Sequence, residues 1–307
     1  MSELTKSSVV ISCLCLLLAA CSEVNTSELT NTITASVTET SFEETKESTP
    51  SETPVPNPVT ETPAEIFTAL VNGEGILLTD YESELIRFHE TSGTGLATYG
   101  EERVLDEMID QVLLAQAADE EGLIVDETMI HERIQKLGIS PQALEEWKTE
   151  YGYTDESFHR AITLAIASAW MRDTIIAGVP NEVEQVHARQ ILLYNSIEAE
   201  TVLTLLEAGT DFETLAEEYD PLTKGDLGWF PRGYLTVNEL DDPLFSLEPG
   251  TYSGIIQSPL GYHIVQVIER NPIHPLTANT RRFVQLQAMT AWLENQRKIG
   301  EIVILVP

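Results

Sequence analysis

Two short strings of residues decide the fold of this chain, Lys224-Gly225-Asp226-Leu227-Gly228-Trp229-Phe230 and Gly261-Tyr262-His263-Ile264-Val265-Gln266-Val267. A strand-like segment, Ala188-Arg189-Gln190-Ile191-Leu192-Leu193, precedes them, and a helix-like segment that ends at Gly209-Thr210-Asp211-Phe212 follows it. The order and spacing of these segments, between His187 and Arg270, carry most of the information in the sequence.

This order and spacing resemble a parvulin-type (PpiC or rotamase) peptidyl-prolyl isomerase domain. A second string, Val71-Asn72-Gly73-Glu74 followed by Thr79-Asp80-Tyr81, is similar to the N-terminal domain of the SurA chaperones and PrsA foldase lipoproteins. Together the resemblances imply an α+β fold, in which a small antiparallel sheet flanked by helices is inserted into a mostly helical chaperone domain. They also imply a reaction, rotation about the peptide bond that precedes proline.

The sequence predicts that the chain begins with an export signal. The apolar run from Val9 to Ala20 has the length of a secretory h-region and is too short to span a bilayer. It ends at Leu18-Ala19-Ala20-Cys21, which resembles the bacterial lipobox and implies lipidation of Cys21 after cleavage. A simple secretory signal and a buried N-terminal strand are the alternatives.

A tether of residues rich in Ser, Thr, Glu and Pro follows the signal. Few large apolar side chains are present, so this segment cannot offset the entropy of folding. The five predicted segments are a lipoprotein signal peptide (1–20), the tether (21–65), an N-terminal helical chaperone domain (66–181), the parvulin-like domain (182–271), and a C-terminal helix and strand (276–307).

Composition narrows the classes of function. Cys13 and Cys15 would leave with the signal, so Cys21 would be the one mature cysteine, which excludes an internal disulfide and a cysteine-based metal site. Lysine and arginine number 17 against 50 acidic residues, a net charge of −33. A phosphate-binding surface needs clustered cations, so nucleic acid is not an expected partner.

Helical periodicity dominates the first half of the body. An apolar face at helical spacing predicts a long helix that stops at Gly122, and Thr79 to Glu82 fits a capping box. Asp126 and Ser140-Pro141 each suit the start of a helix, and a last helix is expected from Asp155 to Ala177. The apolar face comprises Leu105, Met108, Ile109, Val112 and Leu113.

The end of the chain predicts an amphipathic helix over Ala278 to Gly300 and a strand over Ile302 to Val306. The resemblance to SurA and PrsA implies that this segment returns to complete the N-terminal domain. A strand as apolar as Ile302 to Val306 needs a partner, which also favours docking. The alternative is an independent hairpin on the parvulin-like domain.

The resemblance identifies a polar cluster as the candidate catalytic group. His263 matches the histidine of the family's closing strand, although a lone histidine beside apolar neighbours also suits a structural role. Gln190 stands where a second histidine is usual, and glutamine can both donate and accept hydrogen bonds. Asp220, in a shortened loop, matches an acidic or cysteine position, but Asp220-Pro221 equally suits a turn. His187 falls on the opposite face of the strand from Gln190.

An apolar cup for the proline ring is the second part of the expected site. By resemblance Leu235 takes a position usually held by methionine, and Leu240 one usually held by phenylalanine. Leu227 and Phe245 are further candidates, and ordinary core packing is the alternative reading for each. No metal-ligand spacing and no phosphate loop appear in the sequence, and no cofactor is expected.

The leading hypothesis is a lipid-anchored, extracytoplasmic foldase, at the cell surface or in the periplasm. It would be a peptidyl-prolyl cis-trans isomerase whose partners are unfolded exported polypeptides with X-Pro bonds and, through the lipid on Cys21, the membrane. The main alternative is a chaperone that kept the parvulin fold and lost the reaction, binding unfolded clients as a holdase. A third is an assembly factor dedicated to one surface complex.

Overall fold

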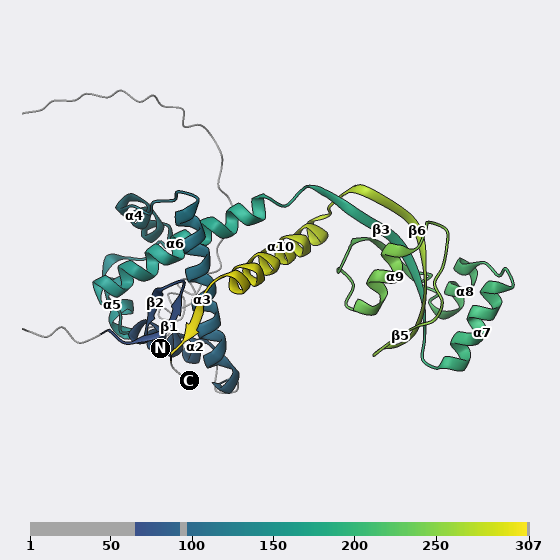
Figure 1. The fold of residues 1–307 in the computed structure, drawn as a ribbon, viewed down its shortest axis with the longest axis horizontal. Helices are drawn as coiled ribbons and strands as arrows, with labels where there is room; N and C mark the ends of the chain where they lie inside the picture. Colours follow the sequence, from purple (N-terminus) through teal and green to yellow (C-terminus); the bar gives the residue numbers. More distant parts are fainter. Residues whose placement is uncertain (1–64, 93–96, 306–307) are drawn as a thin grey trace, which may run out of the picture. The chain divides into compact units, whose positions relative to one another are not determined.

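The computed structural model describes residues 65–92 and 97–305 and shows an α+β protein (Figure 1). The predicted signal peptide, Cys21 and nearly all of the tether lie outside the described residues. The chain divides into two compact units. One contains the described residues up to Ile109 together with His131–Ala161 and the end of the chain from Ile302. The other contains Asp110–Ile130 and Ile162–Glu301.

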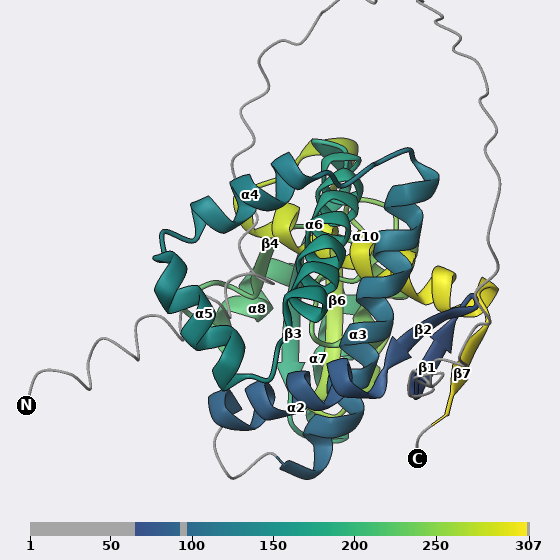
Figure 2. The same ribbon diagram turned by 90° about the vertical axis from the view of Figure 1, so that its left-hand side faces the viewer.

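The first unit is built on an antiparallel sheet with the strand order β2-β1-β7. β1 (Phe67–Val71) and β2 (Glu74–Leu77) form a hairpin, in which Asn72 and Gly73 both have positive φ, as a tight two-residue turn requires. On the other side of β1, the chain's last strand, β7 (Ile302–Ile304), pairs antiparallel with it (Figure 2). The C-terminal strand therefore completes a sheet that begins near residue 67.

Helices pack beside this sheet. The start of α2 corrects one expectation: α2 begins at Leu78, so Thr79 lies inside the first turn and does not cap the helix. The cap at Ser140 is confirmed, because its Oγ accepts from the N–H of Ala143. The helices that contribute residues to this unit are α2 (Leu78–Ser92), α3 (Ala97–Glu120), α4 (Glu127–Lys136), α5 (Pro141–Glu150) and α6 (Asp155–Ala177).

In the second unit α10 (Ala278–Ile299) packs against the later turns of α3 and α6. Arg297, near the end of α10, donates from Nε to the carboxylate of Asp110 at 2.7 Å. No helix among the described residues has both the length and the apolarity needed to cross a bilayer. The apolar contact joins Leu114, Ala118, Ala167 and Met171 to Met289, Trp292 and Leu293.

The same unit holds a four-stranded antiparallel sheet with the order β4-β3-β6-β5. The two central strands, β3 and β6, are much longer than their neighbours and lie side by side along their length (Figure 1). The strands are β3 (Glu182–Leu193), β4 (Asp226–Pro231), β5 (Ile256–Ser258) and β6 (Gly261–Pro275).

Helices cover both faces of this sheet, and strand alternation assigns each residue to one face. α7 (Ser196–Glu207) and α8 (Phe212–Tyr219) pack on the side of Ile191, Leu193 and Ile264. η1 (Asn238–Leu240) and α9 (Asp241–Ser246) pack on the other, on a core that includes Val186, Ala188, Phe230, Val265 and Val267 (Figure 1).

The chain enters this sheet at the start of β3 and leaves it at the end of β6, and these two segments pair with each other. Glu182 pairs with Pro275, and just beyond them the carbonyl of Asn181 accepts from the N–H of Leu276 at 2.9 Å. The side chain of Arg281 donates to the Asn181 side chain at 2.7 Å. Gln185, fully buried, donates from Nε2 to the carbonyls of His274 and Pro275. These hydrogen bonds therefore hold the entering and leaving segments of the chain next to each other.

α10 also contacts the turn that follows β4. The rings of Tyr234 and Phe283 meet edge to face, with centroids 5.2 Å apart. Gln287 donates from Nε2 to the carbonyl of Arg232, and Gly233, at φ +76°, passes so close that a Cβ there would lie 2.6 Å from that Nε2 atom. This turn leads directly to Leu235, so α10 fixes the approach to the α9 side of the sheet.

Candidate active site

His263 lies on β6, 1% exposed, and its ring is held at both nitrogens. Nδ1 is 3.0 Å from Oε1 of Gln190 on β3, and Nε2 is 2.7 Å from Oγ of Ser258 on β5. Gln190 pairs with Val265, so Gln190 and His263 are diagonal neighbours on one face. The structure thus brings together two of the residues predicted from the sequence.

The contacts fix the protonation of the ring. An amide oxygen only accepts, so Nδ1 of His263 carries a proton and donates to Gln190, and in the neutral ring Nε2 then accepts from the hydroxyl of Ser258. Burial lowers the pKa of His263, an effect partly opposed by the charge of Glu239. The imidazole is therefore neutral at pH 7, and it orients Gln190 without using its charge.

Ser258 is a member of this cluster that sequence reasoning missed. It ends β5, where Ile256 pairs with His263 across the hairpin, and its Oγ accepts from the N–H of Leu260 at 3.0 Å. The signal available was its position directly before the turn Pro259-Leu260, which leads into the Gly261-Tyr262-His263 string. Recognising it required the pairing of β5, a strand of three residues.

Gly225, the second residue of the first string, occupies a position that requires glycine. Its carbonyl accepts from the N–H of Gln190 at 2.8 Å, and its φ is +69°. A Cβ at this position would lie 2.0 Å from the carbonyl oxygen of Gln190. The loop before β4 therefore contacts the backbone of β3 at Gln190, the residue that contacts His263. Only glycine permits so close an approach.

Asp220 ends α8, and its side chain organises the loop. The carboxylate accepts from the N–H groups of Leu222 and Thr223 and from the Thr223 hydroxyl. These bonds, that of the hydroxyl foremost, lower the pKa of Asp220. The turn role considered for Asp220-Pro221 is present in the structure, and Asp220 also lines a pocket together with Gln190.

The candidate cup residues gather in one apolar cluster on the α9 side of the sheet. Leu240 and Phe245 are core residues, 2% and 6% exposed, and the guanidinium of Arg232 lies 4.5 Å from the centre of the Phe245 ring. Leu227 and Leu235 are partly exposed at the edge of the cluster. These two leucines offer the accessible apolar surface.

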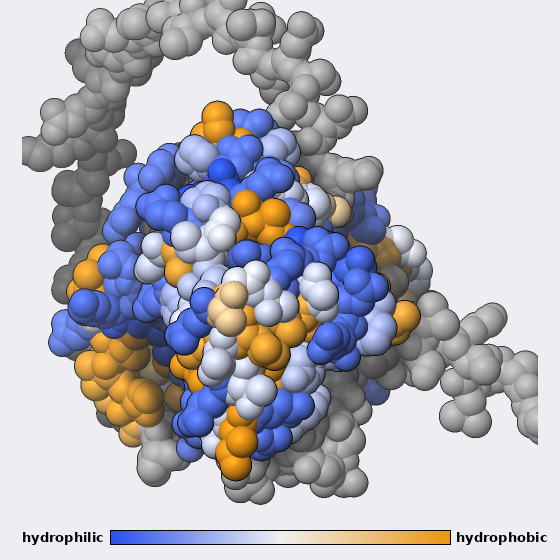
Figure 3. Space-filling view, turned by 90° about the vertical axis from the view of Figure 1, so that its right-hand side faces the viewer, coloured by the Kyte–Doolittle hydropathy of each residue, from blue (hydrophilic) through white to orange (hydrophobic). Residues whose placement is uncertain are grey.

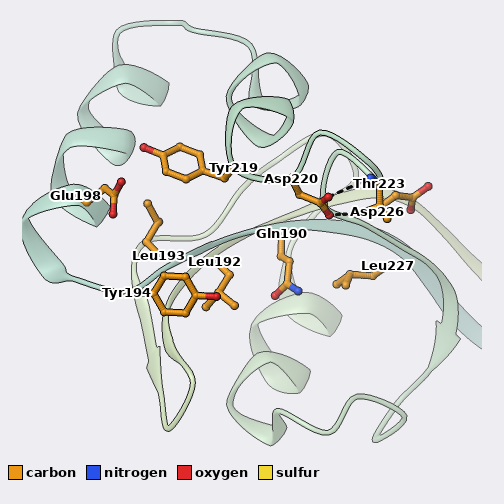
Figure 4. Close-up of a pocket in the computed structure, with 11 residues that line it drawn as sticks. Gln190, Leu192, Leu193, Tyr194, Glu198, Tyr219, Asp220, Thr223, Asp226 and Leu227 are labelled. Atoms are coloured by element: carbon orange, nitrogen blue, oxygen red, sulfur yellow. Dashed lines mark hydrogen bonds between the residues drawn. The ribbon is translucent and has the colours of Figure 1, made fainter.

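A pocket of about 300 Å³ opens beside Gln190 and runs along the end of β3 toward α7 and α8 (Figure 4). At one end are Gln190, Asp220 and Leu227. The surface seen from the side that carries α7 and α8 combines a central group of apolar residues with hydrophilic ones around it (Figure 3). The other lining residues are Leu192, Leu193, Tyr194, Glu198, Tyr219, Thr223, Gly225 and Asp226.

His187 has a different environment from Gln190, as strand alternation predicts. Its Nε2 lies 2.8 Å from the carboxylate of Asp226, and its ring faces Trp229, which stacks on His274 with centroids 4.2 Å apart. His187 therefore does not substitute for a histidine at position 190.

Comparison with known proteins matches residues 195–269 to the family model described as "Rotamase: PPIC-type PPIASE domain". The "Foldase protein PrsA" of Halalkalibacterium halodurans is 32% identical over 199 residues, which cover 56% of this chain and 58% of that protein. The PrsA protein of Caldanaerobacter subterraneus is 27% identical over 229 residues, covering 64% and 72%.

"Chaperone SurA" of Nitrosospira multiformis is 39% identical over 105 residues, 30% of this chain and 24% of that protein. Among solved structures, the crystal structure of the PrsA peptidylprolyl isomerase from Bacillus anthracis is 24% identical and covers 63% of this chain and 95% of that one, with a TM-score of 0.40. The match thus spans less than two thirds of the Halalkalibacterium protein and about a quarter of the SurA protein.

Proposed function

We propose, from the premise that this chain contains a PpiC-type parvulin rotamase domain in a PrsA/SurA-like foldase, that it accelerates cis-trans isomerisation of X-Pro bonds in unfolded exported proteins. The uncatalysed rotation faces a barrier of about 18–20 kcal/mol and is slow enough to limit folding. Catalysis needs no covalent step, because the transition state differs from the ground state by the loss of amide resonance.

The observation that supports the proposal is the hydrogen-bonded pair of His263 and Gln190 beside the partly exposed Leu227 and Leu235. The leucines would take the proline ring and remove water from the carbonyl of the rotating bond. With Oε1 of Gln190 held by His263, its amide N–H groups are left to donate to the nitrogen of the rotating bond, whose lone pair is freed when resonance is lost. Such a donor favours the transition state over the planar amide.

Several finer points belong to the same proposal. Residues 182–271 would carry the reaction, while 66–181 and 276–307 would form the chaperone domain that holds clients. Export, and attachment to the membrane through lipid on Cys21, are supported by the lipobox-like Leu18-Ala19-Ala20-Cys21. The third hypothesis, a factor dedicated to one surface complex, has no residue that favours it.

A second candidate function, a holdase without isomerase activity, is favoured by the environment of Asp220. Its carboxylate already accepts three hydrogen bonds within its own loop, which leaves it poorly placed to serve a substrate. Gln190 in place of a histidine and the near-complete burial of Leu240 and Phe245 point the same way. A cup of this kind would still bind extended apolar segments.

One experiment separates the two functions. The purified protein and its His263→Ala variant are assayed for isomerisation of a short X-Pro peptide and for suppression of the aggregation of an unfolded protein. Leu260→Ala, at a side chain 56% exposed in the neighbouring turn, is the matched control. Acceleration that is lost in His263→Ala but kept in the control supports the isomerase. No acceleration by a folded protein that still suppresses aggregation supports the holdase.

A further inference from the structure

The pocket beside Gln190 extends well beyond the residues used above. Its far end is formed by Tyr194, Glu198 and Tyr219, which come from the end of β3, from α7 and from the end of α8. We propose that this far end binds the side chain of the residue that precedes proline in the client, and that it selects lysine or arginine there. The proposal rests on the isomerase function and names its substrate class.

The pocket adjoins the cup, and this position indicates that the client residue before proline is the one that reaches the pocket. The rotating bond joins that residue to proline, and Gln190 is the polar group placed to meet the nitrogen of this bond. Leu227 lies both in the apolar cluster of the cup and in the wall of the pocket, so the two spaces adjoin. A client with its proline ring at Leu227 and the nitrogen of the rotating bond at Gln190 directs the preceding side chain into the pocket.

The walls of the pocket suit a long side chain with an apolar stem. Leu192 and Leu193, on opposite faces of β3, both line the pocket, and Tyr194 and Tyr219 add aromatic surface (Figure 4). Methylene groups of lysine or arginine pack on such surfaces, and a guanidinium or ammonium group is attracted to the face of an aromatic ring. The volume, about 300 Å³, is sufficient for one such side chain.

The charge of the lining is of one sign. Glu198, Asp220 and Asp226 line the pocket, and its lining contains no lysine or arginine among the described residues. Glu198 faces the Tyr219 phenol (Figure 4), and burial together with the charge of Glu198 raises the pKa of that phenol. The carboxylates at the two ends of the pocket thus create a negative potential throughout it.

The nearest cations contact carboxylates outside the pocket lining, and of the lining residues the charge of Arg189 acts on Asp226. Arg189 donates to Glu213 at 3.0 Å, and Lys224 lies 3.4 Å from Glu213 and 3.2 Å from Glu217. A basic client residue would therefore complete the charge balance of the pocket. An aromatic residue would fill the volume without balancing the charge of the carboxylates, which accept hydrogen bonds from groups of the protein such as the Asn195 amide. An acidic residue would meet like charges.

The test uses peptides of one sequence that differ only before proline, with Arg, Lys, Phe, Leu or Glu at that position. We expect kcat/KM of the full protein to be about tenfold higher for Arg than for Glu at low ionic strength, and the ratio to shrink as salt screens it. Glu198→Gln is expected to lower the ratio about threefold. Glu200→Gln, an exposed position on the same helix outside the pocket, is the control that should leave the ratio unchanged.

Equal rates for Arg and Glu, or a preference for Phe over Arg, would overturn the inference while leaving the isomerase function intact. If no peptide is accelerated, the isomerase function fails, and the affinities of the same peptides are then measured by fluorescence anisotropy. Tighter binding of the Arg peptide than of the Glu peptide, weakened by Glu198→Gln, would still support the selective pocket. Equal affinities would refute it.

Discussion

Nδ1 of His263 lies 3.0 Å from Oε1 of Gln190, and this hydrogen bond joins the two central strands of the sheet on the side of the candidate cup. A second titratable ring at position 190 would compete for the proton between them. The side-chain oxygen of Gln190 can only accept a hydrogen bond from Nδ1, so it keeps the neutral histidine in the tautomer that is protonated at Nδ1. The pair is a fixed polar group rather than an acid-base couple.

The buried neutral ring predicts a pH dependence of stability. Because burial lowers the pKa of His263, the unfolded chain binds a proton that the folded chain excludes as the pH falls below the ordinary histidine value of about 6.5. The unfolding free energy should therefore decrease between about pH 6.5 and pH 5. Urea denaturation should show a shallower decrease in His263→Gln, and equal slopes in the two proteins would contradict this.

A carboxylate at position 190 should raise the pKa of His263, which burial lowers in the unmodified protein. In Gln190→Glu a negative charge would face Nδ1 of His263, and an opposite charge at this distance favours the protonated ring. The pKa of His263, followed by NMR of the imidazole, is expected to rise above that of the unmodified protein. An unchanged or lower pKa in Gln190→Glu would contradict the contact between Nδ1 and position 190.

The two glycines of the first string provide a matched pair, since Gly225 and Gly228 share a φ of +69°. An alanine at 228 meets no atom within 4 Å, whereas one at 225 would collide with the backbone of Gln190. Gly228→Ala should cost about 1–2 kcal/mol of unfolding free energy, the strain of left-handed backbone alone. Gly225→Ala should cost clearly more and abolish activity, and equal losses in chemical denaturation would disprove the backbone contact.

α10 is expected to influence the cup through the turn after β4. Phe283→Ala removes the edge-to-face contact with Tyr234, worth about 0.5–1.5 kcal/mol beyond the burial of the ring. We expect a loss of stability larger than that, because the burial of the ring is lost as well, and a higher KM for an X-Pro peptide, since the turn leads to Leu235. Leu286→Ala, on the same helix at a side chain 62% exposed, should change neither quantity.

The docking of the last strand depends on one donor that can be tested separately. The N–H of Leu305 donates to the carbonyl of Thr68, a fully buried residue. Leu305→Pro removes that donor and should lower the unfolding free energy by about 1–3 kcal/mol, because the carbonyl loses its partner. Leu305→Ala keeps the N–H and loses a side chain only half buried, so its effect in thermal unfolding should be much smaller.

Sequence patterns predicted the long elements well, because each is specified by local signals. α6 has the expected bounds, and α10 ends one residue earlier than predicted, at Ile299. The short strands were less visible: neither β2 nor β5 was predicted from the sequence. At three or four residues a strand is defined by its pairing partner rather than by its own alternation.

The candidate site was predictable only in part, for the same reason. The resemblance located His263 and Gln190, and their contact follows from strand register. Ser258 depends on the pairing of β5, and the pocket end at Tyr194, Glu198 and Tyr219 depends on how two helices pack on a sheet. The capping box at Thr79 failed because β2 continues to Leu77 and passes directly into α2. Contacts between distant segments leave no local mark in a sequence.

The pairing of the segments that enter and leave the four-stranded sheet has a consequence for how the chain can be modified. Since Asn181 and Leu276 are already joined by a hydrogen bond, the stretch between them leaves and re-enters at one point. A short loop could close that gap, so the sheet domain is a cassette that can be excised or exchanged without stretching the remaining backbone. Evolution could replace the chemistry carried by the cassette while leaving the rest of the chain as it is.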